Sequence, residues 1–371
     1  MFDIFDSLRA LLKVDRVSID NDVFRLHYKF TVLILIAFSI VVTSRQYLGD
    51  PIDCIQNDDV PERVLETYCW IHTTFTLPEA FHKKVGVDVP HPGIDKYKPG
   101  QKRMYHQYYQ WVCFVLFLQA ILFYVPRYMW KSYEGNRIKN LILELNRPVP
   151  DPNLNNNKHL LALYLYMNLH YHDLYVSFYL ICEFLNLGNV VGQMFLINLF
   201  LGGEFTKYGI DVIKFSQMEQ ENRTDPMVIV FPRMTKCTFH RFGSSGDIQR
   251  YDALCILPLN IINEKIYIFL WFWFLLLAGL SLLIILYRLI IIVWPYLRYL
   301  VLKSRCRLTS DQDLRTVMRK AGLGDWFVIY TLCKNIEPIH FRDVMSELAI
   351  LLSEEKNPKK RRRLHSDSIA T

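Results

Sequence analysis

Residues 265–288 read KIYIFLWFWFLLLAGLSLLIILYR, in which Lys265 and Arg288 enclose 22 residues without a charged side chain. A helix needs about 20 apolar residues to cross the hydrocarbon core of a bilayer. Three further blocks have the same character: 15 residues between Lys29 and Arg45, 23 between Arg103 and Arg127, and 30, with one charge, between Asp173 and Glu204. The pattern predicts an all-α membrane protein with a bundle of four transmembrane helices.

The composition of the 371-residue chain agrees, because 51% of its residues are apolar and its mean hydropathy is +0.11. The apolar residues fall in long uncharged blocks, which excludes a soluble enzyme and a disordered chain. A transmembrane β-barrel is also excluded, since its strands alternate apolar and polar residues over about 10 positions.

The orientation of the spans is predicted from the lysines and arginines beside them, because such residues stay on the cytosolic side. Arg16, Arg25 and Lys29 precede the first block, Arg127 and Lys131 follow the second, and the C-terminal tail is basic. Both termini and the link between the second and third spans are therefore expected in the cytosol. The two long loops are expected outside the cell.

These boundaries predict a definite order of segments along the chain. We expect a cytoplasmic N-terminal amphipathic helix at 1–26, spans at 27–47, 105–126, 174–203 and 266–294, extracellular loops at 48–104 and 204–265, a cytoplasmic loop at 127–173, and a helical cytoplasmic C-terminal region at 295–371 with a disordered basic end. The basic run at 359–363 is expected to be a solvated, disordered end, and contact with anionic lipid or with a partner is the alternative.

Local patterns predict shorter elements between the spans. Pro126 should kink or end the second span, because proline lacks the amide hydrogen that a helix interior needs. The C-terminal helical pattern should break at Gly322 and Gly324. Three further segments are expected to fold locally: a helix at 60–71 and strands at 228–231 and 235–239.

Two of the eight cysteines fall in each outer loop, Cys54 and Cys69 in the first and Cys237 and Cys255 in the second. An even set in an oxidising space predicts two disulfides, although four cysteines allow three connectivities. The others are expected as reduced thiols, two inside spans and two in the tail: Cys113, Cys182, Cys306 and Cys333. A possible glycosylation site, Asn222 in the sequence Asn-Arg-Thr, lies in the second loop.

Glu183 is the one charge inside the third block, and a carboxylate at membrane depth is a candidate functional group. Asn186, Asn189 and Gln193 follow it at helical spacing and make a polar stripe. Such stripes join helices by hydrogen bonds, so we expect a structural role for Glu183. On that basis Glu183→Gln should keep assembly and conductance, whereas Glu183→Leu should lower surface expression.

Catalytic motifs are missing from the sequence, which has no P-loop, no dinucleotide fingerprint, no HExxH and no GxSxG. His170 and His172 near the third span suggest a di-iron site, but such sites need several more histidine clusters. Cys306 and Cys333 lack the spacing of a zinc site. We therefore expect no catalytic residue, metal, cofactor or nucleic-acid partner.

Several motifs in the sequence together resemble one family of channels. Tyr108, Tyr109, Gln110, Trp111 and Val112 stand at the outer start of the second span. Further motifs are GDPIDC at 49–54, YCWI at 68–71, FPRMTKCTFH at 231–240, CILPLN at 255–260 and GDW at 324–326. The chain resembles the innexins, the invertebrate gap-junction channel proteins, over about residues 1–350.

The resemblance implies that eight subunits surround one pore, and that two such hemichannels dock between cells and pass ions and small metabolites. Co-assembly with other innexins is also implied. Matching the heights of the cysteines above the membrane favours the pairs Cys54–Cys255 and Cys69–Cys237, and the resemblance implies the same nesting. Each cross-link should contribute about 2–5 kcal/mol.

The amphipathic N-terminus is the segment for which the resemblance implies a pore-lining position. An apolar arc with Ile4, Phe5 and Leu8 would face the spans, and the opposite arc would place Asp3 and Asp6 in the lumen, beyond Met1 and Phe2. Acidic rings favour cations. The alternative is a helix that lies on the membrane surface.

Three other functions compete with the docked channel. A glycan at Asn222 could block docking and leave an unpaired plasma-membrane hemichannel, as in pannexin-like channels. A four-span adhesion or scaffold protein is disfavoured, because tetraspanins carry a Cys-Cys-Gly motif and claudins have a much smaller second loop. A membrane enzyme is disfavoured by the missing ligands.

Overall fold

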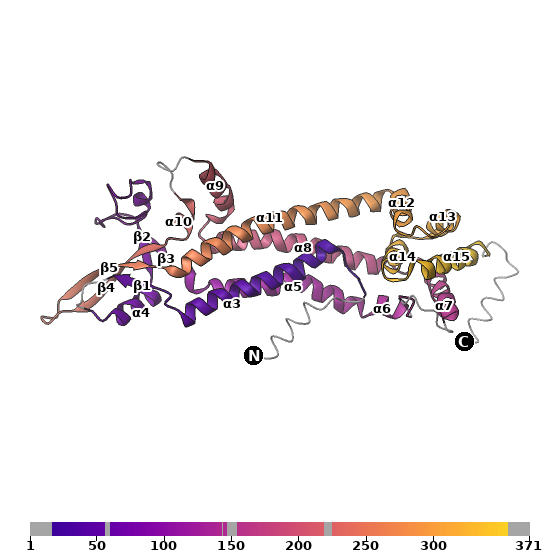
Figure 1. The fold of residues 1–371 in the computed structure, drawn as a ribbon, viewed down its shortest axis with the longest axis horizontal. Coiled ribbons are helices and arrows are strands. Elements are labelled where there is room, and N and C mark those ends of the chain that lie inside the picture. Colours follow the sequence, from indigo (N-terminus) through magenta and orange to yellow (C-terminus); the bar gives the residue numbers. More distant parts are fainter. Residues whose placement is uncertain (1–16, 56–59, 143, 147–153, 219–224, 355–371) are drawn as a thin grey trace. The chain divides into compact units, whose positions relative to one another are not determined.

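The computed structural model describes residues 17–55, 60–142, 144–146, 154–218 and 225–354. The chain divides into two compact units, and Figure 1 traces their elements. One, here called the helical unit, comprises Met1–Lys29, Tyr124–Leu187 and Leu280–Thr371; the other, the strand unit, comprises Phe30–Phe123 and Gly188–Gly279.

Four helices among the described residues are long and apolar enough to cross a membrane. The first runs from Asp22 to Leu48 as α2 (Asp22–Arg25), a π-helical turn (Leu26–Thr31) and α3 (Val32–Leu48). The others are α5 (Val112–Glu134), α8 (Asp173–Phe200) and α11 (Pro258–Val293). The predicted four-span helical membrane protein is confirmed.

The long helices extend beyond the uncharged blocks that predict them. The first begins at Asp22 because the Asn21 side chain caps it, accepting a hydrogen bond from the amide of Phe24 at 2.6 Å. Helix α5 continues through Pro126 to Glu134, so the proline does not end the helix. Helix α11 starts at Pro258, a residue suited to the first helical turn, where its missing amide hydrogen costs nothing.

The strand unit contains a five-stranded sheet of order β1-β5-β4-β2-β3, built from both long loops. Its strands are β1 (Asp53–Ile55), β2 (Thr74–Thr76), β3 (Met104–His106), β4 (Met234–Phe242) and β5 (Ile248–Ile256). All neighbouring pairs are antiparallel. The strand expected at 235–239 lies inside β4, but the all-helical description omits the sheet that surrounds it.

Short helices complete the strand unit. They are α4 (Glu62–His72), α9 (Phe205–Gln217), α10 (Pro226–Val230) and 3₁₀ turns at Pro78–His82 and Tyr108–Gln110. The helix predicted at 60–71 is confirmed by α4. The strand predicted at 228–231 is wrong, because the Asp225 side chain accepts a hydrogen bond from the amide of Met227 and Pro226 starts a helical turn.

Strand alternation gives the sheet two different faces. Cys237 of β4 and Ala253 and Cys255 of β5 are buried in a cluster with Leu65 and Cys69 of α4. Helix α4 therefore covers this face. The residues between them along β4 and β5 point to the opposite face.

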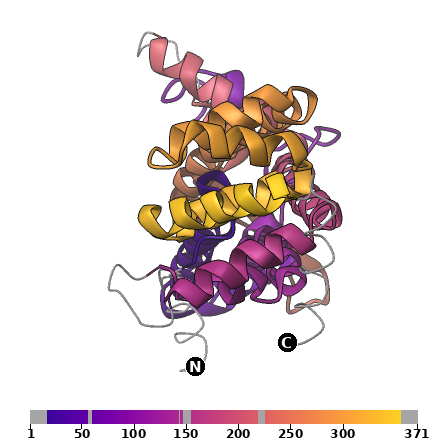
Figure 2. The ribbon, with the colours of Figure 1, turned by 90° about the vertical axis from the view of Figure 1, so that its right-hand side faces the viewer.

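The helical unit is completed by α6 (Arg137–Ile142), α7 (Leu154–Met167), α12 (Pro295–Arg305), α13 (Asp311–Lys320), α14 (Leu323–Asn335) and α15 (Pro338–Glu354). Helix α15 packs against α7 and α13 (Figure 2). The apolar core joins these helices to the segment at 17–28 and the adjacent parts of α5 and α8. The break predicted at Gly322 precedes α14, whereas Gly324 lies inside that helix.

Candidate functional site

Two disulfides hold the two long loops together in the strand unit. Cys54 of β1 is bonded to Cys255 of β5 with an S–S distance of 2.05 Å, and Cys69 of α4 is bonded to Cys237 of β4 at 1.99 Å. These are the pairs that the heights of the cysteines favour. Because each bond joins the first loop to the second, neither loop can move away from the other.

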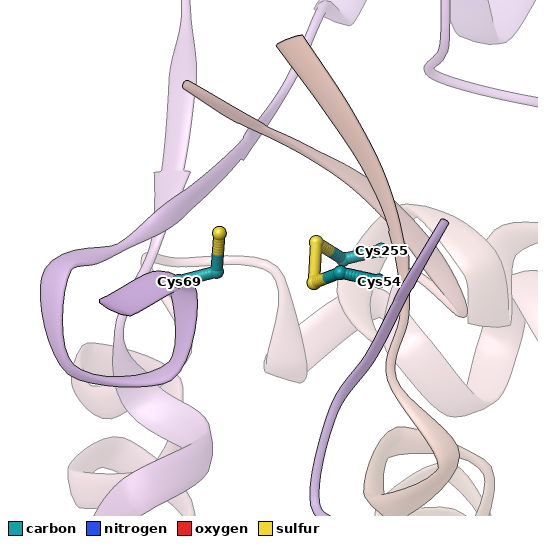
Figure 3. Close-up of side chains that lie close together, drawn as sticks. All are labelled: Cys54, Cys69 and Cys255. Atoms are coloured by element: carbon teal, nitrogen blue, oxygen red, sulfur yellow. A yellow bond between two sulfur atoms is a disulfide. The ribbon is translucent and has the colours of Figure 1, made fainter. Parts of the chain in front are cut away.

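The two disulfides lie close together between α4 and the sheet. Figure 3 shows the Cys69 side chain beside the bond between Cys54 and Cys255, and the three sulfurs lie within 4.8 Å of one another. Sulfurs in disulfides have no thiolate to offer a metal ion. The cluster is therefore a covalent staple, and it is buried: all four cysteines are at most 3% exposed.

The signature at 108–112 connects the strand unit's loops to the start of α5. The Tyr108 hydroxyl donates to the carbonyl of Val230 at 3.1 Å, and the Gln110 side chain donates to the carbonyl of Trp70. Tyr109 is buried against the Trp70 ring, with centroids 4.8 Å apart. The motif thus fixes both loops to the second span, while Val112 is buried and Trp111 is 60% exposed.

Asp20 is the centre of a buried polar network in the helical unit. Arg127 of α5 donates to its Oδ2 at 2.8 Å, and Arg25 donates to its Oδ1 at 2.7 Å. The Tyr28 hydroxyl donates to Oδ2 at 3.0 Å, and Lys334 of α14 donates to its backbone carbonyl at 3.1 Å. Asp20 therefore fixes the segment around residue 20 to one of the long helices, α5, and to the C-terminal helix α14.

Glu183 makes a second buried charged contact in the helical unit. Arg288 of α11 donates to its carboxylate, with Nε 3.1 Å from Oε2, and Asn21 donates to Oε1 at 2.6 Å. The side chains of Glu183 and Arg288 are 4% and 11% exposed. The polar stripe beyond it contains a hydrogen bond from Gln193 to Asn189 at 3.2 Å. Glu183 thus joins two long helices, as expected, but through an ion pair that the sequence does not reveal.

Asp325 explains the Gly-Asp-Trp motif at 324–326. Its carboxylate accepts hydrogen bonds from the Gly322 amide at 2.9 Å and the His172 Nδ1 at 2.8 Å, as well as from the amide of His170. Burial raises the pKa of Asp325, but these hydrogen bonds outweigh burial and the net pKa is lowered. His170 and His172 therefore hold the start of α14.

The other two residues of the motif pack at the same place. A side chain at Gly324 would collide with the backbone of His172, and the Gly324 amide donates to Asp173 at 3.0 Å. The Trp326 indole is buried and donates to the Arg298 carbonyl at 3.0 Å. From the sequence alone, this motif contributed only to the family resemblance, and its structural role was not predicted.

Cys306 and Cys333 differ from the prediction of free thiols. The end of α12 and the last turns of α14 bring their Cα atoms to 6.6 Å, and the structure joins them in a disulfide. The prediction rested on the cytosolic position expected for the tail, where thiols stay reduced, and the sequence did not show that α12 and α14 bring these two cysteines together. Cys113 and Cys182 are free and buried, as expected.

Some predicted site residues lie outside the described part of the chain. These are Met1, Phe2, Asp3 and Asp6 at the N-terminus, Asn222 in the second loop, and the basic run at 359–363.

Comparison with known proteins agrees with the motifs. The family model described as Innexin matches residues 20–351. The chain is 51% identical to Innexin inx2 of Drosophila melanogaster over 98% of this chain and 99% of that protein. It is 54% identical to Innexin inx2 of Schistocerca americana over 94% and 98%, and 50% identical to Innexin shaking-B of Drosophila melanogaster over 96% of each.

Proposed function

Because the chain belongs to the innexin family and is a gap-junction channel subunit of the plasma membrane, we propose that eight copies form one hemichannel around a pore. Each hemichannel docks through its strand units with another on the adjacent cell. The joined pore passes ions and small metabolites between the two cytoplasms. In this arrangement both termini face the cytosol and the five-stranded sheet faces outward.

The observation that carries the docking proposal is the disulfide-stapled sheet. Both loops contribute strands to it, and two buried disulfides cross-link them. A surface that is already rigid loses little conformational entropy when it associates with a partner. The strand unit is thus suited to form a docking surface without a folding step.

The experiment is dual recording from paired cells that both express the chain, with dye transfer as a second readout. We expect junctional current and dye passage in wild type, and neither in the double variant Cys69→Ser with Cys237→Ser, although its chains are still synthesised. Adherent cell pairs without current would favour the adhesion or scaffold function. Currents in single cells but not in pairs would favour the unpaired hemichannel.

The N-terminal segment is proposed to line the pore with Asp3 and Asp6. The Asp20 network supports this placement, since it anchors the described start of the chain beside the long helices of the helical unit. Two carboxylates per subunit become two acidic rings, which give a wide pore a modest preference for cations. The measurement is the reversal potential of single hemichannels in a salt gradient. An unchanged potential in Asp3→Asn with Asp6→Asn would place the segment on the membrane surface instead.

The sequon at Asn222 supports the unpaired hemichannel as a second candidate. A glycan on the second loop would stand in the way of a facing hemichannel. Mass mapping of the surface protein decides whether Asn222 is modified. If it is, Asn222→Gln should raise junctional current in cell pairs while single-cell current stays unchanged.

The remaining partners are proposed on the same premise. Co-assembly with other innexins follows from the family, and contact with anionic lipid follows from the basic run at 359–363. We assign the chain no enzymatic activity, no cofactor and no nucleic-acid partner, because its function as a channel requires none.

A further inference from the structure

A basic pocket opens on the face of the sheet that α4 does not cover. It has a volume of about 410 Å³, and four cationic side chains line it: Lys96, Arg103, Lys236 and Arg250. Lys236 pairs with the one acidic lining residue, Asp252, at 3.1 Å. Arg103 stacks on the rings of Tyr97 and Phe75, at 3.9 and 4.7 Å from the centroids, and its buried Nε has no acceptor among the described residues.

An acidic cluster lies at the β1 edge of the sheet, beside the first turns of α4. Carboxylate oxygens of Asp53 in β1 and of Glu62 and Glu66 in α4 all lie within 4.8 Å of one another. No described lysine or arginine forms an ion pair with them. Burial and the neighbouring carboxylates of Glu62 and Asp53 raise the pKa of Glu66, which is a sign of mutual repulsion.

The strand order separates these two clusters within one rigid body, because β1 is one edge strand of the sheet, whereas the pocket is also lined by β2 and by the segment between β2 and β3 at the other edge. Lys236 and Arg250 alternate along β4 and β5 with Cys237 and Ala253, which pack toward α4. In Figure 1, α4 lies below the strands, and the segment between β2 and β3, which carries Lys96, lies above them. The apolar side chains of Val64 and Ile71 are 50% and 68% exposed, but they lie on the face of α4 turned away from the acids.

A ring of identical subunits brings different faces of each subunit together, because its interfaces are heterologous. One side of every subunit must then complement the opposite side of its neighbour. A cluster of like charges on each side is unfavourable in an isolated subunit, and contact between opposite clusters relieves both.

We propose that the basic pocket of one subunit receives the acidic cluster of the next subunit in the hemichannel ring. The occupant is therefore a second copy of this chain, bound through Asp53, Glu62 and Glu66. The inference rests on the proposed ring of eight subunits, and it adds the contact that fixes the register between neighbouring strand units.

The test uses charge reversals in the full-length chain at exposed positions. The base-reversed variant is Lys96→Glu with Arg250→Glu, and the acid-reversed variant is Asp53→Lys with Glu62→Lys. Each is expected to lower the fraction of chains found as complete rings after detergent extraction by about tenfold or more, because like charges then face each other at every interface. A control variant, Lys84→Glu with Lys98→Glu, reverses two exposed charges outside the pocket and should assemble as wild type.

Co-expression of the two reversed variants is the decisive arm. One variant has two basic sides and the other two acidic sides, so an alternating ring with an even number of subunits is complementary at every interface. We expect rings to return, with both chains present in equal amounts. A variant that simply fails to fold would not be rescued by its partner, and failed rescue would overturn the proposal.

Other outcomes assign the clusters differently. If each reversed variant assembles as wild type, the proposal is wrong, whether or not the rings conduct. If assembly is normal, and inorganic sulfate stabilises wild type but not the base-reversed variant, the pocket binds a free anion and the proposal is wrong. Normal assembly with stabilisation by calcium that Glu62→Lys abolishes would likewise assign the acids to a cation. Absence of rings in wild type would instead refute the proposed function itself.

Discussion

Glu183 of α8 and Arg288 of α11 form an ion pair that is almost removed from solvent, at 4% and 11% side-chain exposure. Their positions differ by 105 in the sequence, so only the packing of the two helices brings them together. Removal of one partner from such a pair leaves the other charge buried without compensation, which costs about 3–5 kcal/mol. This cost changes what a substitution at Glu183 should do.

Glu183→Gln should now lower surface expression, contrary to the expectation from sequence alone that it would be neutral. The amide cannot neutralise Arg288, and Arg288→Gln should be similarly damaging. The double variant Glu183→Gln with Arg288→Gln leaves no buried charge and should recover much of the loss. Surface biotinylation of all three variants measures the effect. Equal expression of wild type and Glu183→Gln would show that solvent or the pore reaches Arg288.

Asp20 should couple the N-terminal segment to channel selectivity. Asp20→Asn weakens the contacts with Arg127 and Arg25, so it should destabilise the anchor by about 1–3 kcal/mol. If the first 16 residues line the pore, the same change should shift the reversal potential of hemichannels in a salt gradient. Asp22→Asn is the matched control, because that side chain is 91% exposed. A shift in both variants, or in neither, would contradict the anchoring role.

The four spans could be predicted because bilayer thickness imposes a length that is visible in one dimension. The 22-residue block between Lys265 and Arg288 needs no tertiary information to be recognised. The pairing of the cysteines could also be predicted from the sequence, because the membrane fixes both ends of each loop. Distances along the chain then translate into heights above it.

The partners of buried charges could not be predicted from the sequence. Asp20 binds Arg127 from 107 residues away, and His172 binds Asp325 from 153 residues away. Nothing local marks either contact, because charge pairing depends on which helices pack together. The strand predicted at 228–231 failed for a local reason instead. The apolar run Val-Ile-Val-Phe suits a strand, but Asp225 caps a helical turn that begins at Pro226.

Gly324→Ala should destabilise the helical unit by more than a helix-interior substitution usually does. Alanine normally stabilises a helix relative to glycine, by about 1 kcal/mol. Here the added Cβ would overlap the backbone of His172, so the sign should reverse. Gly279→Ala in α11 is the matched control, because a Cβ there meets nothing within 4 Å. Thermal unfolding of the detergent-solubilised chain compares the two, and a higher midpoint for Gly324→Ala would refute the packing argument.

His106 should make the strand unit sensitive to acid. The ring is 2% exposed, its Nε2 lies 2.8 Å from the Thr76 hydroxyl oxygen, and burial lowers its pKa from 6.5 to about 4. Between these values the unfolded chain binds a proton that the folded chain refuses, so stability falls as pH decreases from 6.5 toward 4. The loss attributable to His106 reaches about 3 kcal/mol at the acid end. Unfolding midpoints across this pH range should therefore fall less steeply in His106→Gln than in wild type, while the exposed-site control His82→Gln keeps the wild-type slope. Identical slopes for wild type and His106→Gln would show that water or a charged partner reaches the ring.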